Sequence, residues 1–181
     1  MPIADELLNE FETLGRVLSA TPFRLHRTIP ASAVVVDHLM KARETMVHAL
    51  RCEVALKPVV SSQRELLDYL GADMANLLTE RVRILHLNTQ NRLIRDEILS
   101  DGTIDQTSFH IREIVRRAIE LGSASIIVAH NHPSGSSAPS RSDIEMTRRL
   151  SNACGTLGID LIDHIVIASD GSRSFRALGL F

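Results

Sequence analysis

Apolar residues recur at three- and four-residue spacing through the first fifty positions, which is the pattern of amphipathic helices. A first apolar stripe runs from Leu7 to Leu18, and the pattern breaks at Thr21-Pro22. A second helical run is predicted over about 33–50. Residues 51–60 read as an extended connection that ends near Pro58. The pattern therefore predicts a small helical region ahead of a larger unit.

From about residue 61 the pattern changes to alternating helices and strands. Ser62 and Glu65 have capping-box spacing and predict the start of a short helix. Two apolar runs, 82–87 and 93–99, flank a polar turn and predict a β-hairpin. Further elements are predicted as a helix at 111–121, a buried strand at 125–129, a helix at 141–152, a strand at 159–167 and an edge strand ending at Phe175. The predicted fold is mixed α/β.

Composition narrows the class of protein. The chain has 181 residues, of which 44% are hydrophobic and 23% charged, as in folded globular proteins. A formal net charge of −2 gives no global basic field for nucleic acid. Two isolated cysteines indicate a reducing compartment. The first residues lack the pattern of a signal peptide, and no apolar run reaches the roughly 20 residues of a membrane span, so we expect a cytoplasmic protein without a membrane contact.

The chemistry is concentrated at the end of the buried strand. His130 and His132 are two residues apart, so they project to the same side where the strand gives way to a Pro-, Gly- and Ser-rich loop. That loop can bring the start of the next helix back over the same point, where Asp143 would supply an oxygen ligand. Two imidazoles, one carboxylate and a water form the open tetrahedral arrangement of a catalytic zinc site. The expected cofactor is one Zn²⁺ per chain.

A hydrolytic site also needs a base and a donor for the oxyanion. Glu97 lies in the second strand of the predicted hairpin, from which it would take the proton of the attacking water. Ser140 would donate a hydrogen bond to the oxyanion. Each residue also has a structural interpretation. A His-x-His pair alone is a weak signal, Ser140 and Asp143 have capping-box spacing, and a lone strand glutamate is often simply solvated.

Taken together, these five residues match the JAMM motif of the JAB/MPN metalloprotease and isopeptidase superfamily. The chain resembles the RadC branch of that superfamily most closely, from about residue 56 to the C-terminus. The landmarks are Asn91-Arg92-Leu93-Ile94, Glu97, Gly102-Thr103, His110 with Arg112-Glu113-Ile114, His130-Asn131-His132-Pro133-Ser134-Gly135, Pro139-Ser140-Arg141-Ser142-Asp143 and Leu161-Ile162-Asp163-His164-Ile165-Val166-Ile167. One departure is Ile111, where RadC proteins usually have proline.

The resemblance implies a structure and an activity. It implies an MPN-type, cytidine-deaminase-like layered fold over 56–181, in which a curved mixed sheet is flanked by helices. It implies zinc held by His130, His132 and Asp143, with Glu97 as general base and Ser140 at the oxyanion. The implied reaction is hydrolysis of a peptide or isopeptide bond in a peptide or protein substrate. His110 and His164 are further candidates for contacts with the ligands or the substrate, and packed structural histidines are the alternative.

Residues 1–53 are similar to the helix-hairpin-helix region that precedes the metal domain in RadC proteins. The corresponding turn, 29–33, has no glycine, and its proline lacks an amide donor for a phosphate. Arginines such as Arg24 and Arg27 remain candidates for non-specific DNA contacts. Docking or dimerisation is the alternative role of this appendage, and the oligomeric state is open.

Three functions compete at this point. The first is a zinc-dependent hydrolase with a metal-activated water. The second is a DNA-repair-associated accessory protein or metal-dependent nuclease, which the traditional label of the RadC family suggests. The third is a catalytically idle interaction module, against which the complete five-residue motif argues. The neutral charge balance and the glycine-free hairpin weaken the second.

Overall fold

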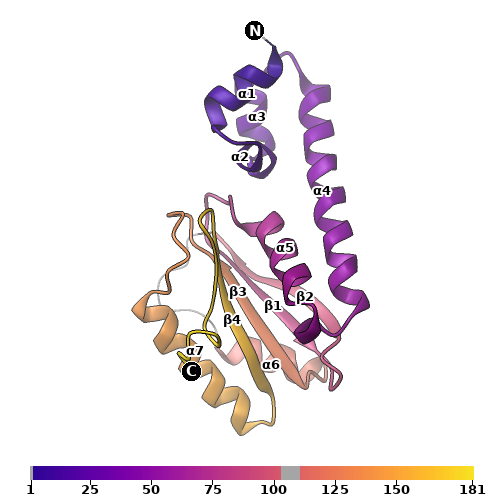
Figure 1. Ribbon diagram of the computed structural model, residues 1–181. Coiled ribbons are helices and arrows are strands. Elements are labelled where there is room, and N and C mark those ends of the chain that lie inside the picture. The colour runs from indigo at the N-terminus through magenta and orange to yellow at the C-terminus, as the bar shows by residue number, and fades with distance from the viewer. Residues whose placement is uncertain (1, 103–110) are drawn as a thin grey trace.

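A five-stranded mixed sheet forms the centre of the larger unit. We describe residues 2–102 and 111–181 of a computed structural model, shown in Figure 1. The strands are β1 (Arg81–Leu87), β2 (Leu93–Asp101), β3 (Ser125–Asn131), β4 (Asp160–Ala168) and β5 (Gly171–Ser174), in the order β2-β1-β3-β4-β5. Only β3 and β4 pair in parallel; the other neighbours are antiparallel. The predicted mixed α/β class and both predicted hairpins are confirmed.

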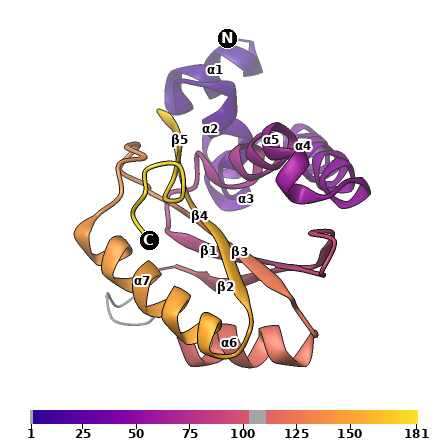
Figure 2. The ribbon, with the colours of Figure 1, turned by 60° about the horizontal axis from the view of Figure 1, so that its bottom comes forward.

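Helices cover both faces of this sheet (Figure 2). On one face α5 (Gln63–Met74) packs on residues such as Leu85 and Ile127, and α4 (Ala33–Leu56) packs on α5. On the other face α6 (Ile111–Glu120) and α7 (Arg141–Thr156) cover residues such as Ile84 and Val128. Because β3 is covered on both sides, all of its residues are buried. This explains the continuous apolar run seen in the sequence.

The connection from β3 to β4 determines where the candidate site lies. Parallel neighbours need a crossover, and α7 supplies it here. The loop after β3 therefore returns the beginning of α7 towards the carboxyl end of that strand. In open α/β sheets this end is where ligands are commonly bound.

The N-terminal helices form a small core of their own. The helices are α1 (Ile3–Phe11), α2 (Leu14–Ser19), α3 (Pro22–Thr28) and the beginning of α4. Their shared buried residues are Leu7, Phe11, Val17, Ala20, Leu25, Ile29 and Val36. Figure 1 shows this group at one end of α4, with the other end of α4 beside the sheet. The long helix α4 therefore links the two cores.

Two local predictions are wrong. Residues 51–56 are not extended, because α4 continues to Leu56 and buries Val54 in the core of the sheet. The helix ends at Lys57, whose extended backbone suits the residue that precedes a proline. Ser62 does stand at the start of α5, but its hydroxyl donates to the Pro58 carbonyl and makes no capping box with Glu65. Among the described residues, no helix is long and apolar enough to cross a membrane.

Candidate metal centre

The three predicted ligands meet at the carboxyl end of β3. His130 is the last residue but one of the strand and has no exposed side-chain surface. His132 follows the strand, and a turn closed by the Gly135 amide on the His132 carbonyl redirects the chain. Asp143 lies in the first turn of α7. Of the described residues, only these three form a group of possible metal ligands, with their ligand atoms within 4.8 Å of one another.

The spacing of the ligand atoms suits a small tetrahedral ion. The Nε2 atoms of His130 and His132 are 2.9 Å apart. Asp143 places Oδ1 3.6 Å from His130 Nε2 and Oδ2 3.4 Å from His132 Nε2. Bonds of about 2.0–2.1 Å to a tetrahedral zinc separate neighbouring ligand atoms by about 3.3 Å. The residues therefore fit Zn²⁺ with sub-ångström adjustments, and a fourth position is left for water or substrate.

Asp143 both caps α7 and faces the histidines. Ser140 accepts a hydrogen bond from the Asp143 amide, and the Ser140 amide donates to Asp143 Oδ2, so the predicted capping box is present. The Ser140 hydroxyl also lies 2.6 Å from Oδ2 and donates to it. Burial raises the pKa of Asp143, but the neighbouring imidazoles of His130 and His132 and the hydrogen bonds from Ser140 outweigh burial and hold the pKa below its usual range. The carboxylate is thus oriented and ionised, as a metal ligand requires.

His132 is oriented from the opposite side of its ring. Its Nδ1 lies 2.9 Å from the Ser136 carbonyl, which can only accept a hydrogen bond. The proton of a neutral His132 therefore belongs on Nδ1, and Nε2 keeps its lone pair for the metal. The pKa of His132 is raised, first by the adjacent Asp143 carboxylate and more weakly by the negative charge of Glu80, against the opposing effect of burial.

His164 lies behind His130, on β4. It is buried, and its Nε2 is 2.8 Å from His130 Nδ1. Its own Nδ1 is 2.6 Å from the Thr147 hydroxyl on α7. Of the two extra histidines suggested by the sequence, His164 thus contacts a ligand residue, whereas His110 lies outside the described residues.

The structure does not bring Glu97 to the ligand group. Glu97 pairs with Ile84, and Ile84 pairs with Val128, so two strand spacings of about 4.8 Å separate Glu97 from β3. Its carboxylate forms ion pairs with Arg117 and Arg95. The hydrogen bond from Arg117 is the largest influence on its pKa, which falls to about 2. A carboxylate held by two arginines at this place is poorly suited to collect a proton at the metal centre.

Glu80 is a second carboxylate whose charge acts on His132, and sequence reasoning did not single it out. The last printed pair of β1 and β3 joins Val82 to His130. Continuing that antiparallel register by two residues places Glu80 opposite His132, on the same face of the sheet. Glu80 is half-buried, and its charge raises the pKa of His132. The missing signal was the pairing of β1 with β3, which the sequence does not reveal.

The side chain of Asn131 holds the backbone on both sides of Glu80. Its Oδ1 accepts from the Arg81 amide at 2.7 Å, and its Nδ2 donates to the Thr79 carbonyl at 3.1 Å. Asn131 has no exposed surface, so both bonds are shielded from water. The residue between the two metal histidines therefore positions the segment that carries Glu80.

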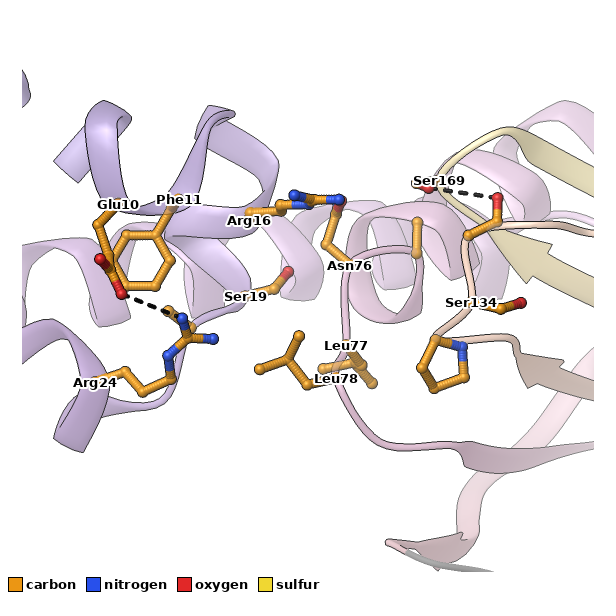
Figure 3. Close-up of a pocket in the computed structure, with 14 residues that line it drawn as sticks. Glu10, Phe11, Arg16, Ser19, Arg24, Asn76, Leu77, Leu78, Ser134 and Ser169 are labelled. Atoms are coloured by element: carbon orange, nitrogen blue, oxygen red, sulfur yellow. Dashed lines mark hydrogen bonds and ion pairs between the residues drawn. The ribbon is translucent and has the colours of Figure 1, made fainter.

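A cavity of about 310 Å³ lies beside the ligand loop (Figure 3). Pro133, Ser134 and Gly135 line one side, directly after His132. Phe11 and Arg24 of the N-terminal helices line the other, and Arg24 pairs there with Glu10 at 3.4 Å. Gly135 has φ +87°, and a Cβ there would lie 2.8 Å from the Ser169 hydroxyl, so glycine is required at this position. The N-terminal helices therefore share a cavity with the loop that follows His132.

Comparisons with known proteins place the chain among its relatives. Residues 60–180 match the family described as RadC-like JAB domain. A UPF0758 protein of Rhodobacter capsulatus is 41% identical over 179 residues, which are 99% of this chain and 84% of the relative. A UPF0758 protein of Ruegeria pomeroyi is also 41% identical over 179 residues, covering 98% of this chain and 80% of the relative.

Proposed function

The chain belongs to the RadC-like JAB domain family, and from this premise we propose that it is a zinc-dependent hydrolase of peptide or isopeptide bonds. The observation that carries the proposal is the convergence of His130, His132 and Asp143 at the carboxyl end of β3. Two imidazoles and one carboxylate with a fourth position left open are the ligand set of catalytic zinc sites. A zinc ion there would polarise the substrate carbonyl and lower the pKa of a water molecule.

In this proposal Glu80 takes the role of general base that the sequence suggested for Glu97. The register of β1 and β3, continued by two residues, puts Glu80 across from His132, whereas Glu97 is held by Arg117 two strands away. Glu80 would accept a proton from the attacking water and deliver it to the leaving nitrogen. Asn131 supports this role because it fixes the amide and carbonyl groups that flank Glu80.

Ser140 has two tasks in the proposed reaction. Its hydroxyl donates to Asp143 Oδ2 and so orients that ligand. Stabilising the oxyanion requires the hydroxyl to rotate towards the substrate carbonyl, while the two backbone-linked bonds of the capping box keep Asp143 in place. The cavity lined by Pro133 and Ser134 would give a substrate segment room beside the loop that follows His132.

The test has two stages, which separate metal binding from catalysis. Zinc content of the purified protein is measured by elemental mass spectrometry for the wild type and for a His130→Ala, His132→Ala double variant. We expect about one equivalent in the wild type and a loss of zinc in the variant. The control is His86→Ala, which removes another buried histidine, one bonded to Ser123 rather than placed at the ligand group. A wild type that takes up no zinc under saturating conditions would contradict the proposal.

The second stage identifies the bond that is cleaved. Zinc-loaded wild type and the double variant are incubated with peptides from a digested proteome and with lysine-branched isopeptides. New amino groups are then labelled and located by mass spectrometry. We expect a defined set of cleavages that only the zinc-loaded wild type produces. Cleavage by both proteins alike would mean that the site is not the source of the activity.

A further inference from the structure

A continuous hydrogen-bonded chain links two of the proposed metal ligands through residues outside the motif. His130 Nδ1 lies 2.8 Å from His164 Nε2, and His164 Nδ1 lies 2.6 Å from Thr147 Oγ1. Thr147 Oγ1 lies 2.6 Å from the backbone carbonyl of Asp143. The side chains of His130 and His164 and the residue Thr147 are each 1% exposed or less. The chain thus begins at one ligand residue, passes through β4 and α7, and ends at another.

The chemistry of the final acceptor sets the direction of every bond in this chain. A carbonyl oxygen only accepts, so the single hydroxyl proton of Thr147 points to Asp143. The Thr147 oxygen then accepts from His164, which places the proton of neutral His164 on Nδ1. His164 Nε2 is consequently an acceptor and receives the proton carried by His130 Nδ1. His130 Nε2 is left with a lone pair that faces His132 and Asp143.

We infer that Thr147 and His164 are positioning residues that fix His130 in the tautomer able to bind a metal through Nε2. This role rests on the proposed metal site: Thr147 and His164 would orient one of its ligands before a metal binds. His132 obtains the same tautomer from the Ser136 carbonyl. Both imidazoles of the site therefore present lone pairs at the point where the two Nε2 atoms are 2.9 Å apart. A cation between them satisfies both.

Packing holds the chain in place. The His164 ring stacks on Phe175 with 4.5 Å between the ring centroids. Its backbone amide donates to Asp163 Oδ1 at 2.8 Å. Thr147 follows Asp143 by one turn of α7, so the helix that supplies the carboxylate ligand also supplies the hydroxyl that orients His164. Movement of α7 would therefore disturb both the carboxylate and the imidazole ligand.

His86 provides a matched comparison within the same chain. It is also buried, and its Nδ1 lies 3.0 Å from the Ser123 hydroxyl. Its other nitrogen faces Glu97 Oε2 at 3.9 Å and not one of the proposed metal ligands. Removing the hydroxyl from Ser123 therefore disturbs a buried histidine without touching the metal centre. A general effect of losing such a bond can thus be separated from an effect on the metal site.

The first experiment measures zinc affinity by competition with a chromophoric chelator. We expect Thr147→Val, which keeps the shape of the side chain and removes the hydroxyl, to weaken zinc binding by about 10- to 100-fold. Thr147→Ser, which keeps the hydroxyl, should stay within about threefold of the wild type, and Ser123→Ala should do so as well. Wild-type zinc affinity in a folded Thr147→Val variant would overturn the inference. Equal weakening in Ser123→Ala would also overturn it.

The second experiment observes the protons without any metal. Long-range ¹H–¹⁵N correlation spectra of the zinc-free protein, labelled at histidine, report which ring nitrogen carries the proton. His164→Gln and His130→Gln variants assign the signals. We expect His164 to carry its proton on Nδ1 in the wild type. In Thr147→Val we expect a mixture of the Nδ1- and Nε2-protonated tautomers. A proton on His164 Nε2 would overturn the inference, even if zinc binds. If the wild type binds no zinc, the proposed function fails while this measurement still decides the direction of the chain.

Discussion

A polar cluster lies on each face of the sheet. In one cluster the charged groups pair with each other, and in the other the side chains direct possible ligand atoms at a common point. On the face of α4 and α5, an arginine network joins Arg43, Arg81 and Arg83 to Asp73 and Asp96. Each of these cations faces a carboxylate, for example Arg83 Nε with Asp96 Oδ1 at 2.8 Å. On the face of α6 and α7, the metal centre ends in ligand atoms that converge on one point.

The difference separates a structural cluster from a reactive one. Burial and charge are common to both, so neither property by itself identifies a site. The arginine network pairs each of its cations with a carboxylate of this chain and ties α4 and α5 to β1 and β2. In the candidate metal centre the Nε2 atoms of His130 and His132 lie 2.9 Å apart beside the Asp143 carboxylate, as ligands of one shared cation would. Glu97 belongs with the first kind of cluster, because Arg117 and Arg95 already satisfy its carboxylate.

The largest expected effect distinguishes Glu80 from Glu97. We expect Glu80→Gln to retain zinc and to lower turnover by about 10²- to 10⁴-fold, because a base within reach of the water is removed. Glu97→Gln should leave turnover within about threefold of the wild type, because the general acid–base step would not use it. Both are measured as kcat on a substrate found in the cleavage screen. The reverse order of effects would restore Glu97 as the base and would show that the carboxylate leaves Arg117 during the reaction.

These residues also show what the sequence could and could not predict. The grouping of His130, His132 and Asp143 was predicted because their spacing is local: one strand end, one loop and one helix start. Glu97 was suggested by its place on a strand, but the position of a base depends on which strands are neighbours. The pairing of β1 with β3, forty residues further along the chain, brings Glu80 to the site. No local pattern encodes such a pairing.

In the fold, too, local features were predicted correctly and features that depend on tertiary contacts were missed. Helices and strands followed from apolar spacing, and the capping box of Ser140 and Asp143 followed from two residue types at a fixed distance. The extension of α4 through 51–56 was missed because its benefit is tertiary: Val54 packs into the core of the sheet. The capping box predicted for Ser62 was wrong because its hydroxyl donates to the Pro58 carbonyl, an acceptor outside the helix.

A substitution in the arginine network should lower the stability of the protein and leave its zinc affinity unchanged. Asp96 has no exposed side-chain surface and accepts hydrogen bonds from Arg83 and Tyr69. Asp96→Ala leaves the Arg83 charge buried with one partner fewer, and breaking such a pair costs about 3–5 kcal/mol of unfolding free energy. Urea denaturation measures the loss, and chelator competition should give the wild-type zinc affinity. Weakened zinc binding in folded protein would contradict the separation of the two clusters.

A matched control for that variant is Asp37→Ala. Asp37 pairs with Lys41 one turn away on the exposed side of α4, at 2.8 Å. Water and salt screen exposed pairs of this kind, so we expect Asp37→Ala to unfold at nearly the wild-type urea concentration. A loss in Asp37→Ala as large as in Asp96→Ala would mean that burial of the arginine network does not account for its contribution.

Asn131 is buried and anchors the segment that carries Glu80, so its replacement should affect both stability and turnover. Asn131→Ala leaves the Arg81 amide and the Thr79 carbonyl without their side-chain partner, at a cost of about 1–3 kcal/mol in unfolding free energy. Because the segment that carries Glu80 loses its anchor, we also expect kcat to fall while zinc content stays at one equivalent. Stability by urea denaturation and kcat are measured on the same preparation. A stability loss with unchanged kcat would mean that Glu80 is held by other contacts.

The smallest expected effect concerns the acid stability that Glu97 provides. Its pKa is about 2 in the folded protein, mainly through the Arg117 hydrogen bond, against an ordinary value of 4.5. A carboxyl group with a lowered folded pKa stabilises the protein above its unfolded pKa and loses this effect as the pH falls towards the folded pKa. The stabilisation by Glu97 is therefore complete above about pH 5 and disappears between pH 4.5 and about 2.

Because the pair is partly exposed, its contribution at neutral pH is about 1 kcal/mol or less. Urea midpoints of the wild type and Glu97→Gln should differ slightly at pH 7, draw closer below pH 4.5 and converge as the pH approaches 2. The same titration performed with and without bound zinc sharpens the comparison. If Glu97 interacts only with Arg117 and Arg95, zinc raises the urea midpoints of both proteins equally at every pH. A zinc-dependent change in the difference between the two proteins would instead place Glu97 in energetic contact with the metal centre.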